Sequence, residues 1–265
     1  MASAPEANLP LFYNDLMPLN SRDHAKWRAK QIESLKWLSG QHAIPLTVDE
    51  FVQTQRDYPI VFSSGENPVP LALMGLNEGV NVFVDENGKV TDPVYIPAYV
   101  RRYPFMLARL TPDAEELSLC FDPTAGVIGD FSEGEILFDD QGKPAPTVEG
   151  ILNFCEQFEQ AGARTQAFIE EIKKHDLLME GEIAITDNSK PDQPFVYRGF
   201  QMINEEKLRE LSGDVLSEWT KNGLLPLLHA HLFSLDLMRV IFGMQMGQGK
   251  VPQPTALNPA ETPAS

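Results

Sequence analysis

The sequence predicts an α+β fold, a mainly antiparallel sheet covered by C-terminal helices. Three observations lead to this class. Residues 9–146 hold short runs of alternating apolar residues, punctuated by Pro and Gly. Residues 147–246 instead carry apolar side chains at helical spacing, with one β interruption. Two stretches of the first part, 44–91 and 96–145, also match each other in order, so we expect the sheet to contain two related helix–strand–hairpin units.

The composition indicates a folded acidic chain with unstructured ends. Of 265 residues, 43% are hydrophobic and 22% are charged, which is usual for globular proteins. The ends, 1–8 and 247–265, are rich in small residues and Pro, and we expect both to be disordered. The formal net charge of −17 disfavours contact with nucleic acid, so we expect no nucleic-acid partner.

The cysteine content and the hydropathy indicate a cytoplasmic protein. Cys120 and Cys155 lie in different predicted elements, and the first residues lack the pattern of a signal peptide. The most apolar stretch, 224–246, is interrupted by Pro226, Asp236 and Arg239. We therefore expect a buried amphipathic helix there and no membrane insertion. The oligomeric state is open, and a homo-oligomer is one possibility.

The first part contains the clearest strand signals. Val80–Val84 alternates with a period of two, and Asp85–Gly88 is a hairpin turn because Asn-Gly tolerates positive φ. The other expected strands are Tyr58–Phe62, Val69–Met74, Leu117–Phe121 and Glu135–Phe138. A basic stretch, Arg22 to Lys36, predicts either a solvated helical face or a docking surface for an acidic partner.

The second part is mostly helical. Thr147 caps a helix that runs to about His175, which Gly162 weakens without breaking. Glu182–Thr186 and Phe195–Tyr197 are expected to form a pair of strands around a polar turn at residues 187–193. Asn204 then caps a short helix. Ser212–Asp214 opens the next turn, and Asn222–Gly223 closes it.

The two matching stretches share a Tyr–Pro corner. Ile44-Pro45 and Ile96-Pro97 each precede a short helix, after which Tyr58-Pro59 and Tyr103-Pro104 start a strand. A residue before proline is pushed out of the α region, so Tyr–Pro ends the helix. Duplication and chance recurrence of a common unit both explain the match. If duplication is real, the seam between the units is a natural place for a pocket.

No familiar catalytic motif is present. The sequence lacks a Gly-rich phosphate loop, a nucleophile elbow, a Cys-x-x-Cys pair and a His-Glu-x-x-His helix. His229 and His231 are two residues apart, so on a helix they point about 200° apart and cannot share a metal. We therefore name no catalytic residue and expect no metal and no cofactor.

The densest unusual segment is Tyr95–Phe105, with three tyrosines, two prolines and two adjacent arginines. Tyr and Arg are typical of binding hot spots, and paired arginines can hold a carboxylate or a phosphate. The candidate residues for binding a partner or ligand are Tyr95, Tyr99, Arg101, Arg102, Tyr103, Phe105, their counterparts Arg56 and Tyr58, and His231. The alternative is that the aromatic rings are core and the arginines pair with acidic groups such as Asp122 or Asp139.

With these residues the chain resembles the SapC-like family, named for a protein of a surface-layer locus. The resemblance runs from about Met17 to Phe242, and Tyr95–Phe105 is its most specific segment. The other matching stretches are Pro18–Asn20 with His24, Asp57–Phe62, Gly75–Gly79, Phe83–Asp85, Gly199-Phe200, Glu206–Leu208, Ala230–Leu232 and Ser234-Leu235. The family name implies a cytoplasmic accessory role in surface-layer protein secretion. The resemblance also implies gene neighbours that resemble tryptophan halogenases, which is the context of a tailoring pathway. It supplies no catalytic residues.

Two main hypotheses follow from these observations. The first is a non-enzymatic accessory protein that recognises a peptide or a partner protein through the Tyr95–Phe105 segment. The second is an enzyme, or an accessory subunit of one, in a peptide- or metabolite-tailoring pathway, with Tyr99, Arg101, Arg102 and His231 lining a pocket. A structural subunit of a larger assembly is a third possibility.

Overall fold

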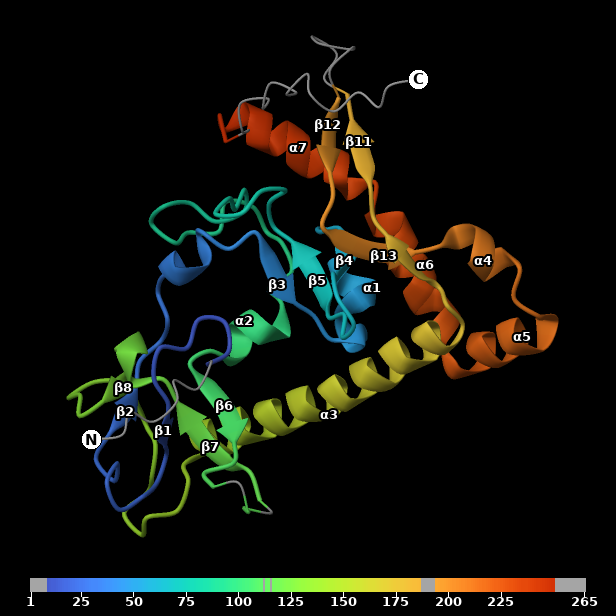
Figure 1. The fold of residues 1–265 in the computed structure, drawn as a ribbon. Helices are drawn as coiled ribbons and strands as arrows, with labels where there is room; N and C mark the ends of the chain where they lie inside the picture. The colour runs from blue at the N-terminus through green and yellow to red at the C-terminus, as the bar shows by residue number, and fades with distance from the viewer. Residues whose placement is uncertain (1–8, 112, 115, 187–193, 251–265) are drawn as a thin grey trace, which may run out of the picture.

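The computed structural model describes residues 9–111, 113–114, 116–186 and 194–250, and it confirms the α+β class (Figure 1). The largest sheet has five antiparallel strands in the order β10-β13-β4-β5-β3. Their bounds are Leu178–Glu180, Phe200–Ile203, Ile60–Ser63, Pro70–Leu73 and Ala43–Pro45. The C-terminal part of the chain therefore supplies two strands of this sheet, β10 and β13.

Three smaller sheets complete the described β structure. The order β1-β7-β6 joins Met17–Pro18, Ser118–Phe121 and Phe105–Ala108. The order β8-β2-β9 joins Ile128–Gly129, Arg28–Ala29 and Glu135–Ile136, and β11 (Ile183–Ile185) pairs with β12 (Phe195–Tyr197). The expectation that one sheet holds the strands of both proposed units is therefore wrong, because β4 and β5 lie in a different sheet from β6 and β7.

The longer helices lie in the C-terminal part of the chain, as predicted. The α-helices are α1 (Phe51–Thr54), α2 (Ala98–Arg102), α3 (Pro146–Lys174), α4 (Glu205–Arg209), α5 (Gly213–Asn222), α6 (Leu224–Ser234) and α7 (Leu237–Gly247). Short 3₁₀ turns occur at η1 (Lys36–Leu38), η2 (Val48–Glu50) and η3 (Pro123–Ala125). The cap at Asn204 forms as predicted, whereas α3 begins one residue before Thr147, at Pro146. The turn expected between Ser212 and Gly223 is instead the helix α5, which Ser212 caps by accepting the Val215 N–H.

Helix α3 connects two hydrophobic cores. Its 29 residues span roughly 44 Å, and the helix runs along one side of the molecule (Figure 1). Val148 and Cys155 near its start belong to the smaller core, beside Phe105 and Phe121. Its second half instead belongs to the larger core, through Phe168, Ile169 and Ile172. The two cores are therefore held at a fixed separation by one rigid element.

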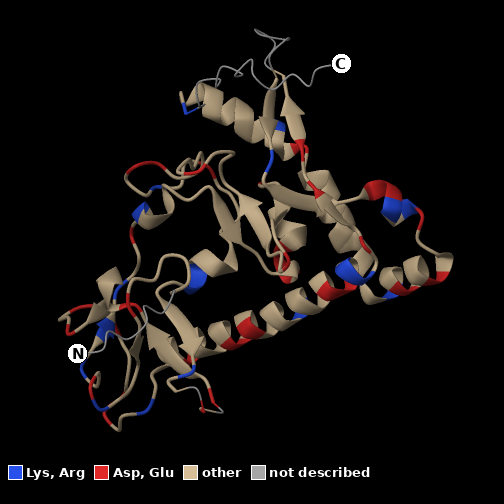
Figure 2. Cartoon of the chain, in the orientation of Figure 1, with Lys and Arg blue, Asp and Glu red and all other residues tan. Residues whose placement is uncertain are grey.

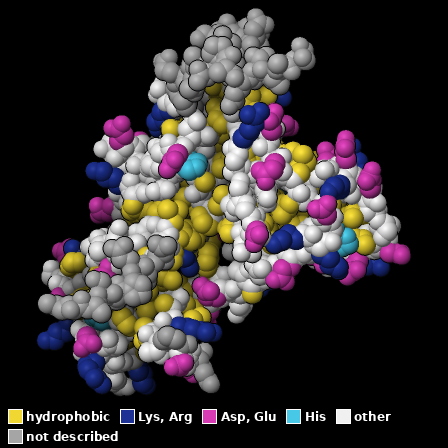
Figure 3. Space-filling model, in the orientation of Figure 1, with side chains coloured by type: hydrophobic (Ala, Val, Ile, Leu, Met, Phe, Trp, Pro, Cys, Tyr) yellow, Lys and Arg dark blue, Asp and Glu magenta, His cyan; other side chains and the backbone are white. Residues whose placement is uncertain are grey.

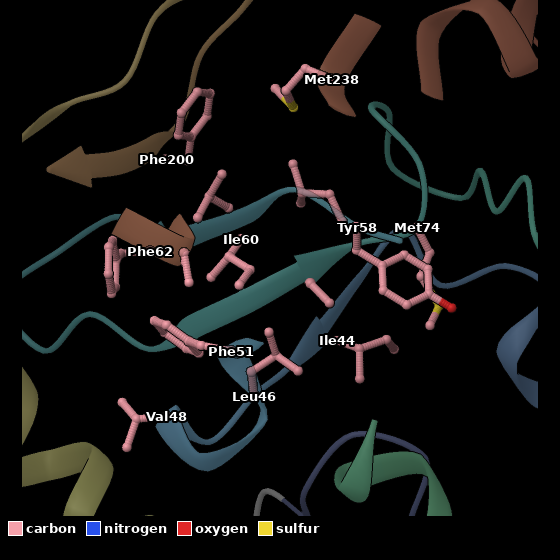
Figure 4. Close-up of a cluster of buried hydrophobic side chains, with 14 of the residues drawn as sticks. Ile44, Leu46, Val48, Phe51, Tyr58, Ile60, Phe62, Met74, Phe200 and Met238 are labelled. Carbon is pink, nitrogen blue, oxygen red and sulfur yellow. The ribbon is translucent and has the colours of Figure 1, made fainter. Parts of the chain in front are cut away.

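The larger core lies on the five-stranded sheet. Figure 4 shows apolar side chains from several elements converging there, among them Ile60 and Phe62 of β4 and Phe51 of α1. Each of these three side chains is fully buried. Burying side chains of this size contributes about 1.5–3 kcal/mol each, so this cluster is the main source of stability.

The two proposed repeat units share an order of strand pairing and a similar turn. The edge strand β3 pairs with β5, which pairs with β4, and in the same way β1 pairs with β7, which pairs with β6. Asp85 and Asp139 each accept two backbone N–H groups in a turn that ends with a positive-φ glycine, Gly88 or Gly142. Ile96-Pro97 forms no strand, and Met17–Pro18 takes the position that β3 holds in the first unit. Duplication itself remains a prediction.

Two local expectations are wrong. Val80–Val84 is not a strand, because Asn81 Oδ1 accepts the N–H groups of Phe83 and Val84 and bends the chain there. The stretch from Arg22 to Lys36 is not a helical face, since it contains β2 and then a run without regular secondary structure before η1.

The apolar C-terminal stretch forms two helices rather than one. By length and composition, Leu224–Gly247 passes as a candidate membrane span. In the structure a turn at Leu235-Asp236 divides it into α6 and α7, and a third of its most apolar window is buried. Residues 247–250 are also placed, with Lys250 Nζ donating to the Asn81 carbonyl over 2.7 Å. The expected turn at 187–193 and the ends 1–8 and 251–265 lie outside the described residues.

Gly162 provides a test of the continuity of α3. It lies inside the helix, and a Cβ added there meets no atom within 4 Å. Gly162→Ala should therefore raise the free energy of unfolding by about 0.5–1 kcal/mol, because alanine loses less backbone entropy in a helix. Urea denaturation measures this change. Destabilisation would contradict a continuous helix through residue 162.

Candidate functional site

The segment Tyr95–Phe105 passes between the two cores. Tyr95, Tyr99 and Val100 pack against the larger core, whereas Phe105 belongs to the smaller one. Tyr99 and Tyr103 are each only 6% exposed. The aromatic side chains of this segment are therefore mostly core, and a partner can reach only parts of it.

The phenol groups of the candidate tyrosines bond to distant backbone. Tyr58 Oη donates to the Tyr95 carbonyl over 2.9 Å, and Tyr99 Oη donates to the Leu11 carbonyl over 3.2 Å. Tyr103 Oη lies 3.5 Å from Asp122 Oδ2. Burial raises the pKa of Tyr58 and Tyr99, and it raises the pKa of Tyr103 to about 12. These groups therefore stay neutral at physiological pH and donate structural hydrogen bonds.

Glu50 holds the start of this segment and was not among the candidate residues. Its Oε1 accepts from Tyr95 Oη over 3.0 Å and from the Ala98 backbone N–H over 2.6 Å. Its Oε2 accepts both from the Thr47 N–H and from the Thr47 hydroxyl. The buried carboxylate is thus satisfied on both oxygens. The sequence signal was available, because Thr47-x-x-Glu50 is a capping box.

The N-terminal residues complete an aromatic cluster around Tyr103. The Phe12 ring lies 4.4 Å from that of Trp37, and the Trp37 ring lies 4.7 Å from that of Tyr103. Tyr13 Oη donates to the Phe105 carbonyl over 2.7 Å. Phe12 has φ of 83°, a left-handed conformation that is strained for a bulky residue. The contacts of these rings hold that conformation in place.

The three candidate arginines lie in different surroundings. Arg56 is exposed. Arg101 is exposed as well, but its Nε donates to the Ile96 carbonyl over 3.0 Å and an Nη donates to Tyr95 Oη over 3.1 Å. Arg102 is buried, with its guanidinium carbon 4.6 Å from the centre of the Tyr99 ring. The suggested pairing with Asp122 or Asp139 does not occur, and the carboxylate beside Arg102 is Glu159.

A groove of about 810 Å³ opens beside Tyr103. Aromatic side chains of Trp37 and Tyr103 line it, together with Asn14, Thr124, and the exposed run from Lys30 to Ser34, which has no regular secondary structure. Residues Ala125, Val127, Glu133 and Gly134 complete the lining. Aromatic rings beside amide and hydroxyl groups are typical of ligand-binding clefts.

A second cavity of about 420 Å³ lies on another side of the segment. It brings together Arg101, Arg102 and Phe105 with the first turns of α3. No residue lines both cavities. In the face drawn in Figure 3, hydrophobic side chains gather in the middle of the molecule. Within the described residues, no group of three or more His, Cys, Asp or Glu side chains has the arrangement of a metal site.

Comparison with protein families identifies the chain. The SapC family model matches residues 19–241, which is most of its length. The chain belongs to the SapC family. No curated protein and no solved structure matches it significantly. The family of this SapC-family chain is therefore established by its sequence, and its candidate site is identified from the geometry described above.

His231 lies away from both cavities of this SapC-family chain. The imidazole is fully buried between β4 and β13, where Nδ1 donates to the Ile60 carbonyl over 2.7 Å and Nε2 accepts the Ile203 N–H over 3.1 Å. Ser234 Oγ accepts the Ile60 N–H over 2.8 Å. The expected pocket of Tyr99, Arg101, Arg102 and His231 therefore does not form. His231 instead bridges two strands whose own ladder stops at Phe62 and Gln201.

His231 should make the stability of the protein depend on pH. Burial lowers its pKa to about 4, below the 6.5 of an unfolded chain, so the unfolded state binds more protons between these values. The free energy of unfolding should be unaffected by this group above pH 6.5. It should then fall by about 1.4 kcal/mol per pH unit toward pH 4, about 3 kcal/mol in total.

Urea denaturation of wild-type and His231→Gln proteins at several pH values measures this contribution. The glutamine variant should be less stable at pH 7 and should lose this part of the slope between pH 6.5 and 5. The matched control is His229→Gln on the same helix, where Nδ1 bonds only to the carbonyl of Leu225. Identical slopes in wild type and His231→Gln would contradict the role given to His231.

Proposed function

We propose that this SapC-family chain is a non-enzymatic binding protein that recognises a peptide segment of a partner protein. The groove beside Tyr103 is the binding site. The observation that carries the proposal is the lining of this groove, which joins the rings of Trp37 and Tyr103 to Lys30–Ser34, an exposed run without regular secondary structure. A cytoplasmic accessory role in secretion, as the family resemblance implies, is the setting we propose for this recognition.

Two features of the groove suit an extended peptide. The run Gln31–Ser34 is exposed and lies outside any strand, so its backbone can pair with an added chain. The rings of Trp37 and Tyr103 offer large rigid contact area, and such side chains dominate binding energies in peptide and protein interfaces. Lys30, Glu33 and Glu133 also line the groove, and they determine which charged side chains of a peptide bind favourably there.

The enzyme hypothesis receives less support from this geometry. It needed Tyr99, Arg101, Arg102 and His231 around one pocket, and His231 is enclosed between strands instead. The lining of the groove is indole, phenol, amide, hydroxyl and charged side chains in the manner of a recognition surface. We therefore carry only the binding hypothesis forward.

Selection of displayed random peptides on the full-length protein tests this proposal. Fluorescence anisotropy then measures the affinity of the selected peptides for wild type and for variants. Trp37→Ala and Ile32→Asp should each weaken binding at least about tenfold, because one removes an aromatic anchor and the other places a charge in the groove. Val52→Asp, at a similarly exposed apolar residue outside the groove, should leave binding unchanged.

Thermal melting of each variant separates lost binding from lost folding. Ile32 is 37% exposed, so its replacement should leave the melting temperature close to that of wild type. Selected peptides that bind Trp37→Ala and Ile32→Asp as tightly as wild type would overturn the assignment of the groove. A selection that yields no binding peptide would overturn the proposed function.

A further inference from the structure

The second cavity combines apolar walls with a positive end. Phe105 of β6 and Ile151 and Phe154 of α3 form the apolar part, and Arg101 and Arg102 of α2 form the charged part. Among the described residues, no acidic side chain lines it, although the chain as a whole has a net charge of −17. Figure 2 shows basic positions on α2 and several acidic positions along α3. The local charge therefore opposes that of the protein.

Arg102 carries a hydrogen-bond donor that no described group uses. Its side chain is 6% exposed, and its buried Nε has no hydrogen-bond partner in the described part of the chain. Glu159 Oε1 lies 3.8 Å from Nη1, beyond hydrogen-bond distance. A buried charged donor left without an acceptor costs free energy, and native proteins rarely retain one without a reason.

The surroundings of Arg102 hold the guanidinium in place without satisfying Nε. Its guanidinium carbon lies 4.4 Å from the centre of the Phe158 ring and 4.6 Å from that of the Tyr99 ring. These cation–π contacts fix the side chain but accept no hydrogen bond. Arg102 also lines the cavity, so a fixed guanidinium whose buried Nε has no acceptor belongs to its wall.

Arg101 is also preorganised at this cavity. Its bonds to the Ile96 carbonyl and Tyr95 Oη use two of its N–H donors, and its guanidinium carbon lies 5.2 Å from the centre of the Phe154 ring. A guanidinium has five such donors, so others remain for a ligand. Arg101 and Arg102 thus supply two anchored cations beside the apolar lining of this cavity.

The start of α3 adds to the attraction for an anion. No side chain caps this helix, and Thr147 and Gly150 of its first turns line the cavity. The backbone N–H groups at the start of a long helix carry a partial positive charge and favour anions. The start of α3 and Arg102 line the same cavity, so both favour an anion there.

We propose that this cavity binds a carboxylate attached to an apolar body. Arg101 and Arg102 take the carboxylate, and Phe105, Ile151 and Phe154 contact the apolar part. The C-terminal residue of a peptide and a small aryl-alkyl acid share this chemistry. The site is separate from the groove beside Tyr103, so it does not depend on the proposed peptide recognition there.

Titration with matched acids and amides tests the site. The probes are 3-phenylpropionate and N-acetyl-Ala-Ala-Phe, each compared with its carboxamide by isothermal titration calorimetry. Each acid should bind at least about tenfold more tightly than its amide, because only the acid pairs with the arginines. The tighter of the two acids identifies the source of the carboxylate. Equal binding of acid and amide, or no binding of either acid, would overturn the proposal.

Variants and NMR provide the second arm of the test. Arg101→Gln should weaken acid binding at least about tenfold, whereas Arg56→Gln, at the matching position of the first unit, should leave it unchanged. Arg102→Gln removes a buried group and can unfold the protein, so its role is read in the wild type instead. The ¹H–¹⁵N signal of Arg102 Nε–H should move downfield with the acid and stay in place with the amide. An unmoved signal at saturating acid would sink the assignment of Arg102.

Discussion

The packing of α3 into both hydrophobic cores is the constraint on which the rest of the structure depends. One end of this helix contributes Val148 and Cys155 to the smaller core, and the other contributes Phe168 and Ile172 to the larger one. The chain must therefore cross between two separated cores elsewhere, and it does so along α2 and β6. Both cavities border on that crossing.

The crossing segment is fixed by groups that are far away in the sequence. Tyr99 reaches the Leu11 carbonyl, and Glu50 binds both Tyr95 and the N–H of Ala98. This packing buries most of the surface of the aromatic side chains in Tyr95–Phe105. What remains accessible is an edge of Tyr103 on one side and the arginine end with Phe105 on the other. Both cavities therefore border a segment that is packed into the cores, and the groove beside Tyr103 is completed by the exposed run Lys30–Ser34.

The sequence predicted the elements whose signals are local. α3 carries helical periodicity, β7 alternates, β4 and β5 are short apolar runs, and Asn204 is a readable helix cap. The strands β1, β2 and β8 were missed because each has two residues and forms only through pairing with distant chain. β13 was missed for a related reason, since it is four residues long and pairs with the distant strand β4 as well as with β10.

The candidate site was predicted in part. The Tyr95–Phe105 segment does border two cavities, but composition could not show that its tyrosines point into cores, because their partners are up to 88 residues away. Arg101 and Arg102 look alike in the sequence and differ in burial because the Arg102 guanidinium packs against the rings of Tyr99 and Phe158. His231 resembled a pocket residue, and its structural role depends on where two strands diverge.

The central claim is that Tyr95–Phe105 is a packed crossing between cores in the free protein and not a loop that orders on binding. Amide hydrogen–deuterium exchange of the unliganded full-length chain tests this most directly. The account predicts slow exchange for peptides covering residues 98–108, comparable to β4 and β5, with faster exchange at 31–34 in the groove. Fast exchange across 98–108 that becomes slow only when a ligand is added would contradict it.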